Sequence, residues 1–263
     1  MQALAHPGRL IFATAVAALG VENLICAHVS QAVFAKSSPI VPVIPFVPAI
    51  PLLAYLVGLI LLATGVSIAL NLRPRFAAFL LGLLFVLCVL VLFVPKAVAR
   101  PLDLNIRTCL FEEMALGASA LTLAGELRAK TRSFAFGDTL LDRLGSSAPY
   151  FFAISSIVFG VTHFLILRFI ASLVPAWLPG HLFFAYLTGA AFIAAGLSVA
   201  TGVLARWGAF WLGVMFLLWF LILHAPRVIM HPRIPAEWSS MLIALAMCGG
   251  AWIVAGSEPR RVP

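Results

Sequence analysis

The sequence predicts an all-α integral membrane protein with eight transmembrane helices, arranged as two parallel four-helix repeats of the same orientation. The first observation is composition: 63% of the residues are hydrophobic, 10% are charged, and the mean hydropathy is +1.12. These values exclude an ordinary soluble domain. The second is a series of apolar runs long enough to cross a bilayer. The third is that the two halves of the chain resemble each other.

The two halves align without a gap from the second helix onward. Residues 54–58 recur as residues 185–189, and roughly 24 of about 78 aligned positions are identical at a constant offset of about 131 residues. The identities fall mainly on small residues and on turns, so they indicate scaffold positions. We therefore expect a duplicated and fused unit, with a first repeat at 1–126, a cytoplasmic linker at 127–148 and a second repeat at 149–263.

Each apolar run has the roughly 20 residues that a helix needs to cross about 30 Å of hydrocarbon. None of the runs alternates as the strands of a membrane barrel do. The expected helices cover residues 9–29, 48–72, 75–94, 108–126, 149–171, 181–203, 206–225 and 238–256.

The connections between these runs follow from their composition. The first run resembles a signal peptide, but residues 19–23 match residues 159–163 inside the chain, which favours a retained helix. Prolines predict an extended first loop, and Arg73-Pro74-Arg75 predicts a tight turn. The loop prolines are Pro39, Pro42, Pro45, Pro48 and Pro51.

The distribution of Lys and Arg predicts the orientation. A four-span repeat has an even number of spans, so both copies sit the same way up, about an axis along the membrane normal. Positive residues are in excess on the side of the two termini, which predicts that both termini lie in the cytoplasm, with the bacterial inner membrane as the expected location. That side holds Arg9, Arg73, Arg75, Arg128, Lys130, Arg132, Arg143, Arg206, Arg260 and Arg261, and the other side holds Lys36, Lys96, Arg100, Arg107, Arg168, Arg227 and Arg233.

Polar side chains inside predicted spans are the candidate site residues, because an ionisable group costs several kcal/mol in the bilayer. Glu22 and Asn23 lie in the outer half of the first helix, and the repeat superposes Asn23 on His163. Both copies thus place polar groups at one depth. Two interpretations remain open: these groups line a shared interior cavity, or they form helix–helix hydrogen bonds that only fix packing.

A second cluster lies where the seventh helix ends and the eighth begins. It contains His224, Arg227 and Glu237. Glu237 suits a helix N-terminus, where Ser239 or Ser240 is expected to help cap the helix. His224 falls opposite Phe93 of the first repeat, so the fold does not require a histidine there, and a histidine can exchange protons near neutral pH.

Glu112 and Glu113 lie about one turn into the fourth helix, opposite Ile243 and Ala244 of the second repeat. An ion pair with Arg107 or Arg100 is the structural explanation, and a cavity site is the functional one.

Other classes of site find no support in the sequence. The four cysteines occur singly, without metal-ligand spacing or a disulfide framework, although Cys26 and Cys109 are expected on the same side and are able to pair if close. We expect no metal site, and no nucleic-acid partner because the positive charges flank spans. Trp207, Trp211 and Trp219 repeat at helical spacing, which favours lipid-facing or packing roles over a quinone platform.

Several short motifs, taken in their order, resemble the DoxX and DoxX-like membrane protein family. They are clearest in the second repeat, and the two repeats together cover nearly the whole chain. The motifs are Phe159-Gly160-Val161-Thr162-His163, Gly202-Val203-Leu204-Ala205-Arg206, His224-Ala225-Pro226-Arg227 and Glu237-Trp238-Ser239-Ser240. The resemblance implies a four-helix membrane unit associated with quinone-linked oxidoreduction or with redox partner proteins.

Three functions are therefore considered. The first is a redox-associated or quinone-linked membrane subunit that has no cofactor of its own and acts as an accessory to a redox partner protein. The second is a small-molecule or lipid carrier with a site between the repeats. The third is a non-catalytic membrane scaffold. An independent enzyme with a complete active site is the least expected.

Overall fold

The chain is folded entirely from helices in the part that the structure describes. The computed structural model describes residues 5–26, 50–129 and 138–257, and these ranges contain no strand. The helices run in order as α1 (Ala5–Cys26), α2 (Ile50–Ala69), α3 (Pro74–Cys88), η3 (Val89–Phe93), α4 (Val94–Ala99), α5 (Leu104–Ala129), α6 (Asp138–Leu165), α7 (Leu167–Leu173), α8 (His181–Thr201), α9 (Ala205–Trp219), η4 (Phe220–His224), α10 (Ala225–Met230) and α11 (Pro235–Gly256).

Six described helices are long and apolar enough to cross a membrane. This is the architecture of a multi-pass integral membrane protein, as the composition predicts. The remaining two predicted spans fall on α2 and α5. The described apolar part of α2, Tyr55–Ala69, is shorter. Helix α5 is long, but Glu112 and Glu113 lower its mean hydropathy. The six helices are His6–Ile25, Pro74–Ala99, Arg143–Leu165, His181–Thr201, Ala205–Met230 and Pro235–Gly256.

Several predicted boundaries differ from the structure, most of all those of α6. Helix α6 begins at Asp138, not near residue 149, so most of the expected polar linker is helical. Polar residues there end the hydropathy signal without ending the helix. The same helix ends at Leu165, where Ile166 leaves helical geometry at φ −117° and ψ 34°. Pro51 lies in the first turn of α2, a position that tolerates proline, while the rest of the predicted extended loop lies outside the described residues.

A π-helical turn interrupts the same place in both halves. Segments η3 and η4 are each five residues long and lie just before Pro95 and Pro226. The N–H of Val94 bonds the carbonyl of Val89 five residues back, and Ala225 bonds Phe220 in the same way. Because proline has no N–H to continue the α-helical ladder, we attribute the inserted residue to it.

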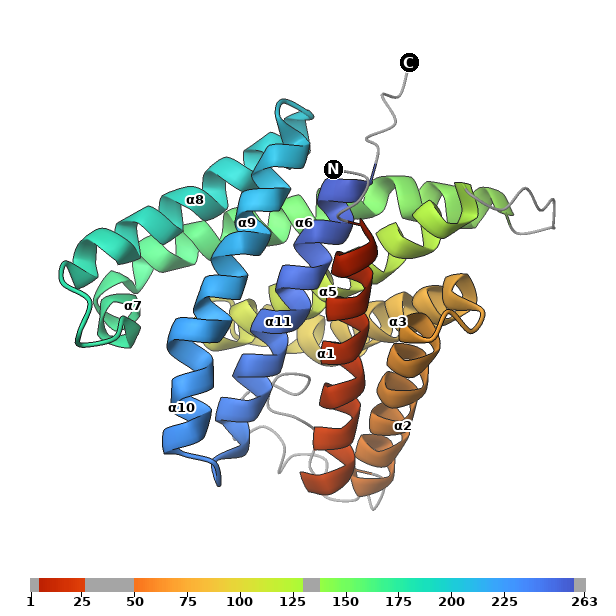
Figure 1. The fold of residues 1–263 in the computed structure, drawn as a ribbon, viewed down its shortest axis with the longest axis horizontal. Coiled ribbons are helices and arrows are strands. Elements are labelled where there is room, and N and C mark those ends of the chain that lie inside the picture. The colour runs from red at the N-terminus through yellow and green to blue at the C-terminus, as the bar shows by residue number, and fades with distance from the viewer. Residues whose placement is uncertain (1–4, 27–49, 130–137, 258–263) are drawn as a thin grey trace.

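The helices form two layers of four that cross each other (Figure 1). One layer has the order α9, α11, α1, α2, and the other has the order α8, α6, α5, α3. Helix α1 therefore packs on α11, and α6 packs on α5, so the first helix of each half contacts the last helix of the other half. Helices α5 and α11 also touch each other where the layers meet.

Glycines allow the closest of these approaches, and they do so at equivalent positions. A Cβ placed on Gly20 would lie 2.7 Å from the carbonyl oxygen of Gly58, and one on Gly160 would lie 2.6 Å from that of Gly189. A side chain at either position would force the two backbones apart. Gly58 of α2 and Gly189 of α8 thus lie at close helix contacts, as expected for small residues between membrane helices.

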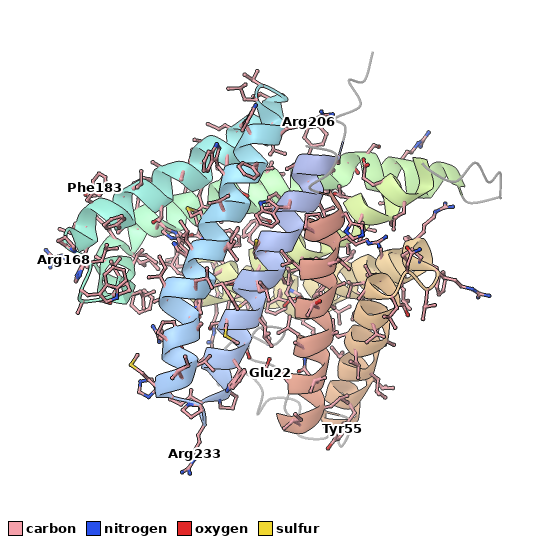
Figure 2. All side chains as sticks on the ribbon, in the orientation of Figure 1. Glu22, Tyr55, Arg168, Phe183, Arg206 and Arg233 are labelled. Carbon is pink, nitrogen blue, oxygen red and sulfur yellow. The ribbon has the colours of Figure 1, made fainter. Side chains whose placement is uncertain are left out.

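Positive residues lie at the ends of several helices. Arg9 at the start of α1 donates to the side-chain oxygen of Asn71, in the turn between α2 and α3, at 3.0 Å. Figure 2 shows Arg206 at one end of α9 and Arg233 beyond the opposite end, beside α10. Arg9 and Arg206 were predicted on one side of the membrane, and Arg233 on the other.

Candidate functional site

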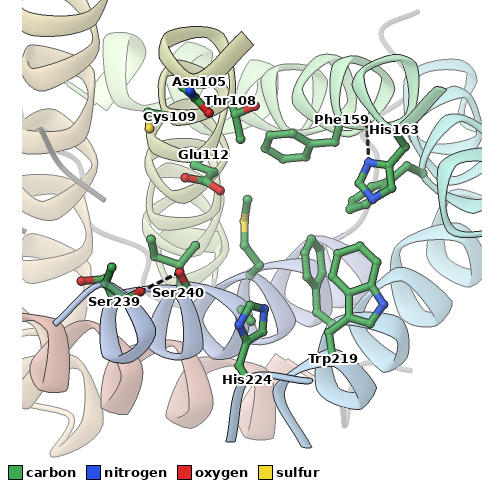
Figure 3. A pocket seen from close by; sticks show the side chains of 16 residues that line it. Asn105, Thr108, Cys109, Glu112, Phe159, His163, Trp219, His224, Ser239 and Ser240 are labelled. Atoms are coloured by element: carbon green, nitrogen blue, oxygen red, sulfur yellow. Dashed lines mark hydrogen bonds between the residues drawn. The ribbon is translucent and has the colours of Figure 1, made fainter. Parts of the chain in front are cut away.

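A cavity of about 240 Å³ lies among α5, α6, α8, α9, η4 and α11. Its walls combine a polar side from α5 and α11 with an aromatic side from α6, α8 and α9 (Figure 3). Three predicted site residues, Glu112, His163 and His224, line it. The other lining residues are Asn105, Thr108, Cys109, Phe159, Phe192, Phe216, Trp219, Ala236, Ser239, Ser240, Ile243, Ala244 and Met247.

The aromatic side is held together by ring contacts. His163 stacks on Trp219, with ring centroids 5.7 Å apart and planes 15° from parallel. Phe192 packs against both rings, at 5.1 Å from His163 and 5.5 Å from Trp219. The Nδ1 atom of His163 lies 2.8 Å from the backbone oxygen of Phe159, which fixes the imidazole orientation (Figure 3). This wall suits a flat, apolar ring.

His224 is the last residue of η4 and lines the cavity from the side of α11 (Figure 3). The extra residue of the π turn rotates the following side chains around the helix axis. Such turns occur often at functional sites. Within the described part of the chain, Nδ1 of His224 is buried without a hydrogen-bond partner. A buried polar atom left unpaired is costly in a folded protein, so it marks a place where a ligand or water would be bound.

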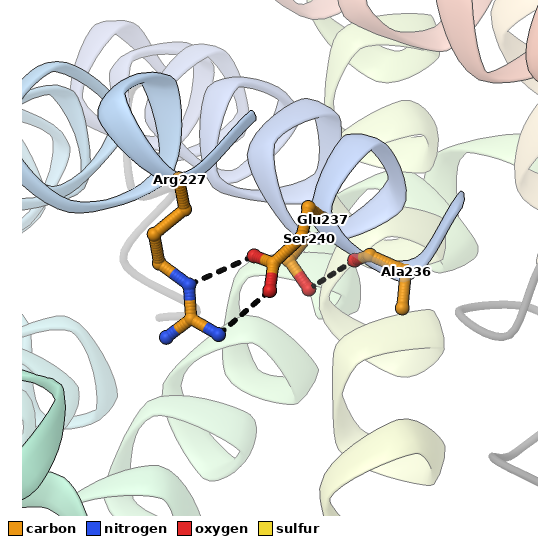
Figure 4. A network of polar contacts seen from close by, with 4 residues as sticks. All are labelled: Arg227, Ala236, Glu237 and Ser240. Carbon is orange, nitrogen blue, oxygen red and sulfur yellow. Dashed lines mark hydrogen bonds and ion pairs between the residues drawn. The ribbon is translucent and has the colours of Figure 1, made fainter. Parts of the chain in front are cut away.

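Arg227 and Glu237 form a two-pronged ion pair beside the cavity. Arg227 Nε donates to Glu237 Oε2 at 2.8 Å, and Arg227 Nη2 donates to Oε1 at 2.7 Å (Figure 4). The pair joins α10 to the first turn of α11. The predicted serine cap is wrong: Ile234 occupies the cap position without a side-chain bond, and Ser240 donates back to the carbonyl of Ala236. A serine inside a helix can satisfy its hydrogen on that carbonyl and need not cap the end.

Glu22 contacts the cavity wall indirectly. Ser239 Oγ donates to Oε1 of Glu22, a contact that joins α1 to α11 across the two halves. Oε2 of Glu22 is buried and has no partner among the described residues. Figure 2 places Glu22 low on α1, at the level of the α10–α11 end. Glu22 therefore supports a lining residue without lining the cavity itself.

Comparison of the chain with protein-family models, with curated proteins and with solved structures finds no match. The site is therefore interpreted from its own geometry.

Two more predicted residues, besides Glu22, Arg227 and Glu237, lie outside the cavity. Asn23 is fully buried and donates to the carbonyl of Leu19 at 3.0 Å, within its own helix. It packs under α2, since a Cβ on Gly58 would lie 3.2 Å from its Cβ, just as His163 packs under Gly189 at 3.1 Å. Glu113 is 1% exposed, and its Oε2 has no partner in the described chain. Thus the repeat matches Asn23 with His163 in position, but only His163 reaches the cavity.

The histidines and aromatic rings of the cavity come from the second half of the chain, and α5 of the first half supplies part of its polar wall. At the repeat offset, His224 corresponds to Phe93, Trp219 to Cys88 and Phe192 to Leu61. These three counterparts are 0%, 6% and 1% exposed, so the first half packs the equivalent space with its own side chains. The helices recur in the two halves, but His224 and Trp219 do not.

Several lining residues were not singled out in the sequence. Asn105 and Thr108 lie on α5, where the sequence analysis named only Glu112 and Glu113 as candidates. Trp219 was predicted to pack or to face lipid. It lines the cavity, whereas Trp207 and Trp211 on the same helix are 51% and 60% exposed. Trp219 stands opposite Cys88 of the first repeat, and this difference could have marked it as a candidate site residue. The side chain of Cys26 lies outside the described residues, so its predicted pairing stays a prediction.

No three His, Cys, Asp or Glu side chains are grouped to hold a metal ion within residues 5–26, 50–129 and 138–257. The side chains that line the cavity offer hydrogen bonding and ring stacking.

Proposed function

We propose that the chain is a membrane protein of the DoxX-like type, built from two fused four-helix halves that sit the same way up and cross the bilayer eight times. The recurring helix ends, the paired π turns and the reciprocal packing of α1 on α11 and α6 on α5 support this arrangement. Equivalent glycine contacts in the two halves support it further. In this arrangement both termini face the cytoplasm of a bacterial inner membrane, where the larger group of positive residues lies.

We infer that the cavity binds the ring of a membrane quinone, and that the protein acts as a quinone-linked subunit for a redox partner protein. The observation that carries the inference is the meeting of a stacked aromatic wall with His224 and His163 in one cavity between membrane helices. Its volume of about 240 Å³ is below the ~300–1,000 Å³ typical of pockets for drug-sized ligands. A single substituted ring fits that scale, with its isoprenoid tail extending into the bilayer.

In this role the protein provides binding and orientation, and the partner provides the electron carrier. Phe192, Phe216 and Trp219 would position the ring, and His224 would hold a ring oxygen through its unpaired nitrogen. Apolar side chains line much of the cavity, and a less polar surrounding strengthens such hydrogen bonds.

Quinone binding is tested by tryptophan fluorescence of the purified protein in lipid nanodiscs. A short-chain quinone should quench part of the emission saturably, because the quinone would stack beside Trp219. W219F should remove the saturable part. W211F, at an exposed position on the same helix, should keep it. Quenching that is linear with quinone concentration in all three proteins would mean partition into lipid only, and would contradict the proposal.

A carrier is the second candidate, because the cavity lies between α5 and α11, one helix from each proposed half. In that case reconstituted protein should move a cavity ligand across liposomes, and E22Q should slow the movement by loosening the link between α1 and α11. Quinone binding without movement would favour the redox subunit. A scaffold would show neither.

A further inference from the structure

The hydroxyl groups on the polar wall of the cavity already donate their hydrogens to acceptors within the protein. Thr108 Oγ1 donates to the carbonyl of Leu104 at 2.8 Å, and Ser240 Oγ donates to that of Ala236 at 2.8 Å (Figure 4). A hydroxyl has one hydrogen and two lone pairs. Both side chains therefore present lone pairs to a ligand and no further hydrogen.

The same holds for two more lining residues. Ser239 donates its hydrogen to Glu22. The Nδ1 atom of His163 lies 2.8 Å from the carbonyl oxygen of Phe159. Because a carbonyl only accepts, Nδ1 must carry the hydrogen, and Nε2 of the neutral ring is then an acceptor.

Few strong donors remain on this wall: the side-chain amide of Asn105, which lies at the exposed edge, and the single N–H of a neutral His224. The thiol of Cys109 is a weak donor, and the indole N–H of Trp219 belongs to the aromatic side. A quinone brings two carbonyl oxygens and no hydrogens, so it leaves the lone pairs of Thr108 and Ser240 without partners. The corresponding quinol brings two O–H groups and can donate to them. A half-buried acceptor that a ligand covers without donating to it loses its hydrogen bond to water, so this difference favours the quinol.

We propose that the cavity binds the reduced, dihydroxy form of an aromatic ring more tightly than its quinone. This proposal rests on the proposed quinone-ring function and names the redox form that the site takes. We expect a preference of about tenfold, which corresponds to about one hydrogen bond. Since the quinol is the two-electron reduced form, a tenfold preference raises the midpoint potential of the bound couple by about 30 mV.

Three ligands separate hydrogen donation from ring stacking. They are a short-chain 1,4-dihydroxynaphthalene, its dimethyl ether and the matching 1,4-naphthoquinone, titrated anaerobically into the full-length protein in nanodiscs by calorimetry. The ether has the same ring and cannot donate. The diol should bind about tenfold more tightly than the other two, which should bind alike.

Variants of the wall test which atoms make the distinction. T108V and S240A each remove one acceptor, and both should weaken diol binding severalfold while changing ether binding by less than about twofold. S172A is the matched control, because the hydroxyl of Ser172 also bonds a backbone carbonyl in its own helix, that of Phe169, away from the cavity. It should change nothing.

The outcomes are distinguishable. Diol binding no tighter than ether binding, or a quinone that binds more tightly than the diol, would overturn the preference and leave quinone-ring binding in place. Unchanged diol affinity in both wall variants would also overturn it. If none of the three ligands binds saturably, the proposed function fails as well.

Discussion

Replacing His224 by phenylalanine should weaken quinone binding at least about tenfold without unfolding the protein. The substitution removes the unpaired nitrogen that we assign to a ring oxygen, and such a hydrogen bond contributes about 1–3 kcal/mol when buried. Phenylalanine also adds apolar volume at the edge of the cavity. The fold should tolerate it, because the equivalent position of the first half is Phe93, the fully buried last residue of η3. The measurement is the dissociation constant from saturable fluorescence quenching, together with the thermal midpoint.

The matched control for this variant is H181F. His181 begins α8 and does not line the cavity, so its replacement should leave the dissociation constant unchanged. A wild-type dissociation constant in H224F, with an intact fold, would remove His224 from the binding site.

Splitting the chain at the connection between α5 and α6 should show that neither half folds alone. Fragment 134–263 lacks α5 and α1, which cover α6 and α11 in the whole protein. Without them the buried glycine and alanine faces of α11 would meet only lipid and would lose their close packing. Expressed alone, the fragment should be degraded or should aggregate, and co-expression with fragment 1–133 should restore a complex that binds quinone.

The readout is size-exclusion chromatography of the detergent-solubilised fragments. A monodisperse monomer of 134–263 with a cooperative thermal transition would show that the halves are independent domains. A stable homodimer of that fragment would instead mean that its own α11 and α6 replace the missing partners, which the similarity of the two halves permits.

Hydropathy and the repeat were enough to place most helices, because a span needs a run of apolar residues and a proline or glycine marks its end. The turn before Pro74 and the matching turn at Gly202, with φ 76°, were predictable for that reason. The start of α6 at Asp138 was not, because a helix can continue through polar residues once it leaves the hydrocarbon. The exchange of helix partners between the halves was not predictable either. A helix that is apolar on all sides carries little periodic signal to show which face meets which neighbour.

The candidate site was predictable where the two repeats differ. His224 stands opposite Phe93, and that difference pointed to a residue that the scaffold does not need. The same logic failed for Asn23, which shares the position of His163 but bonds its own helix. It also missed Thr108, because a hydroxyl side chain in a membrane helix is ordinarily satisfied by a carbonyl of the same helix. Only the three-dimensional structure shows that its other face borders a cavity.

Photolabelling tests the central claim, quinone-ring binding in the cavity, most directly. Membranes that contain the full-length protein would be illuminated with an azido-quinone, and the labelled peptides would be mapped by mass spectrometry. We predict that the label falls on cavity residues of α9 and α11, such as Phe216 and Met247, and disappears when excess unlabelled quinone is present. Label confined to lipid-exposed side chains such as Trp211, or label that excess quinone does not displace, would contradict the account.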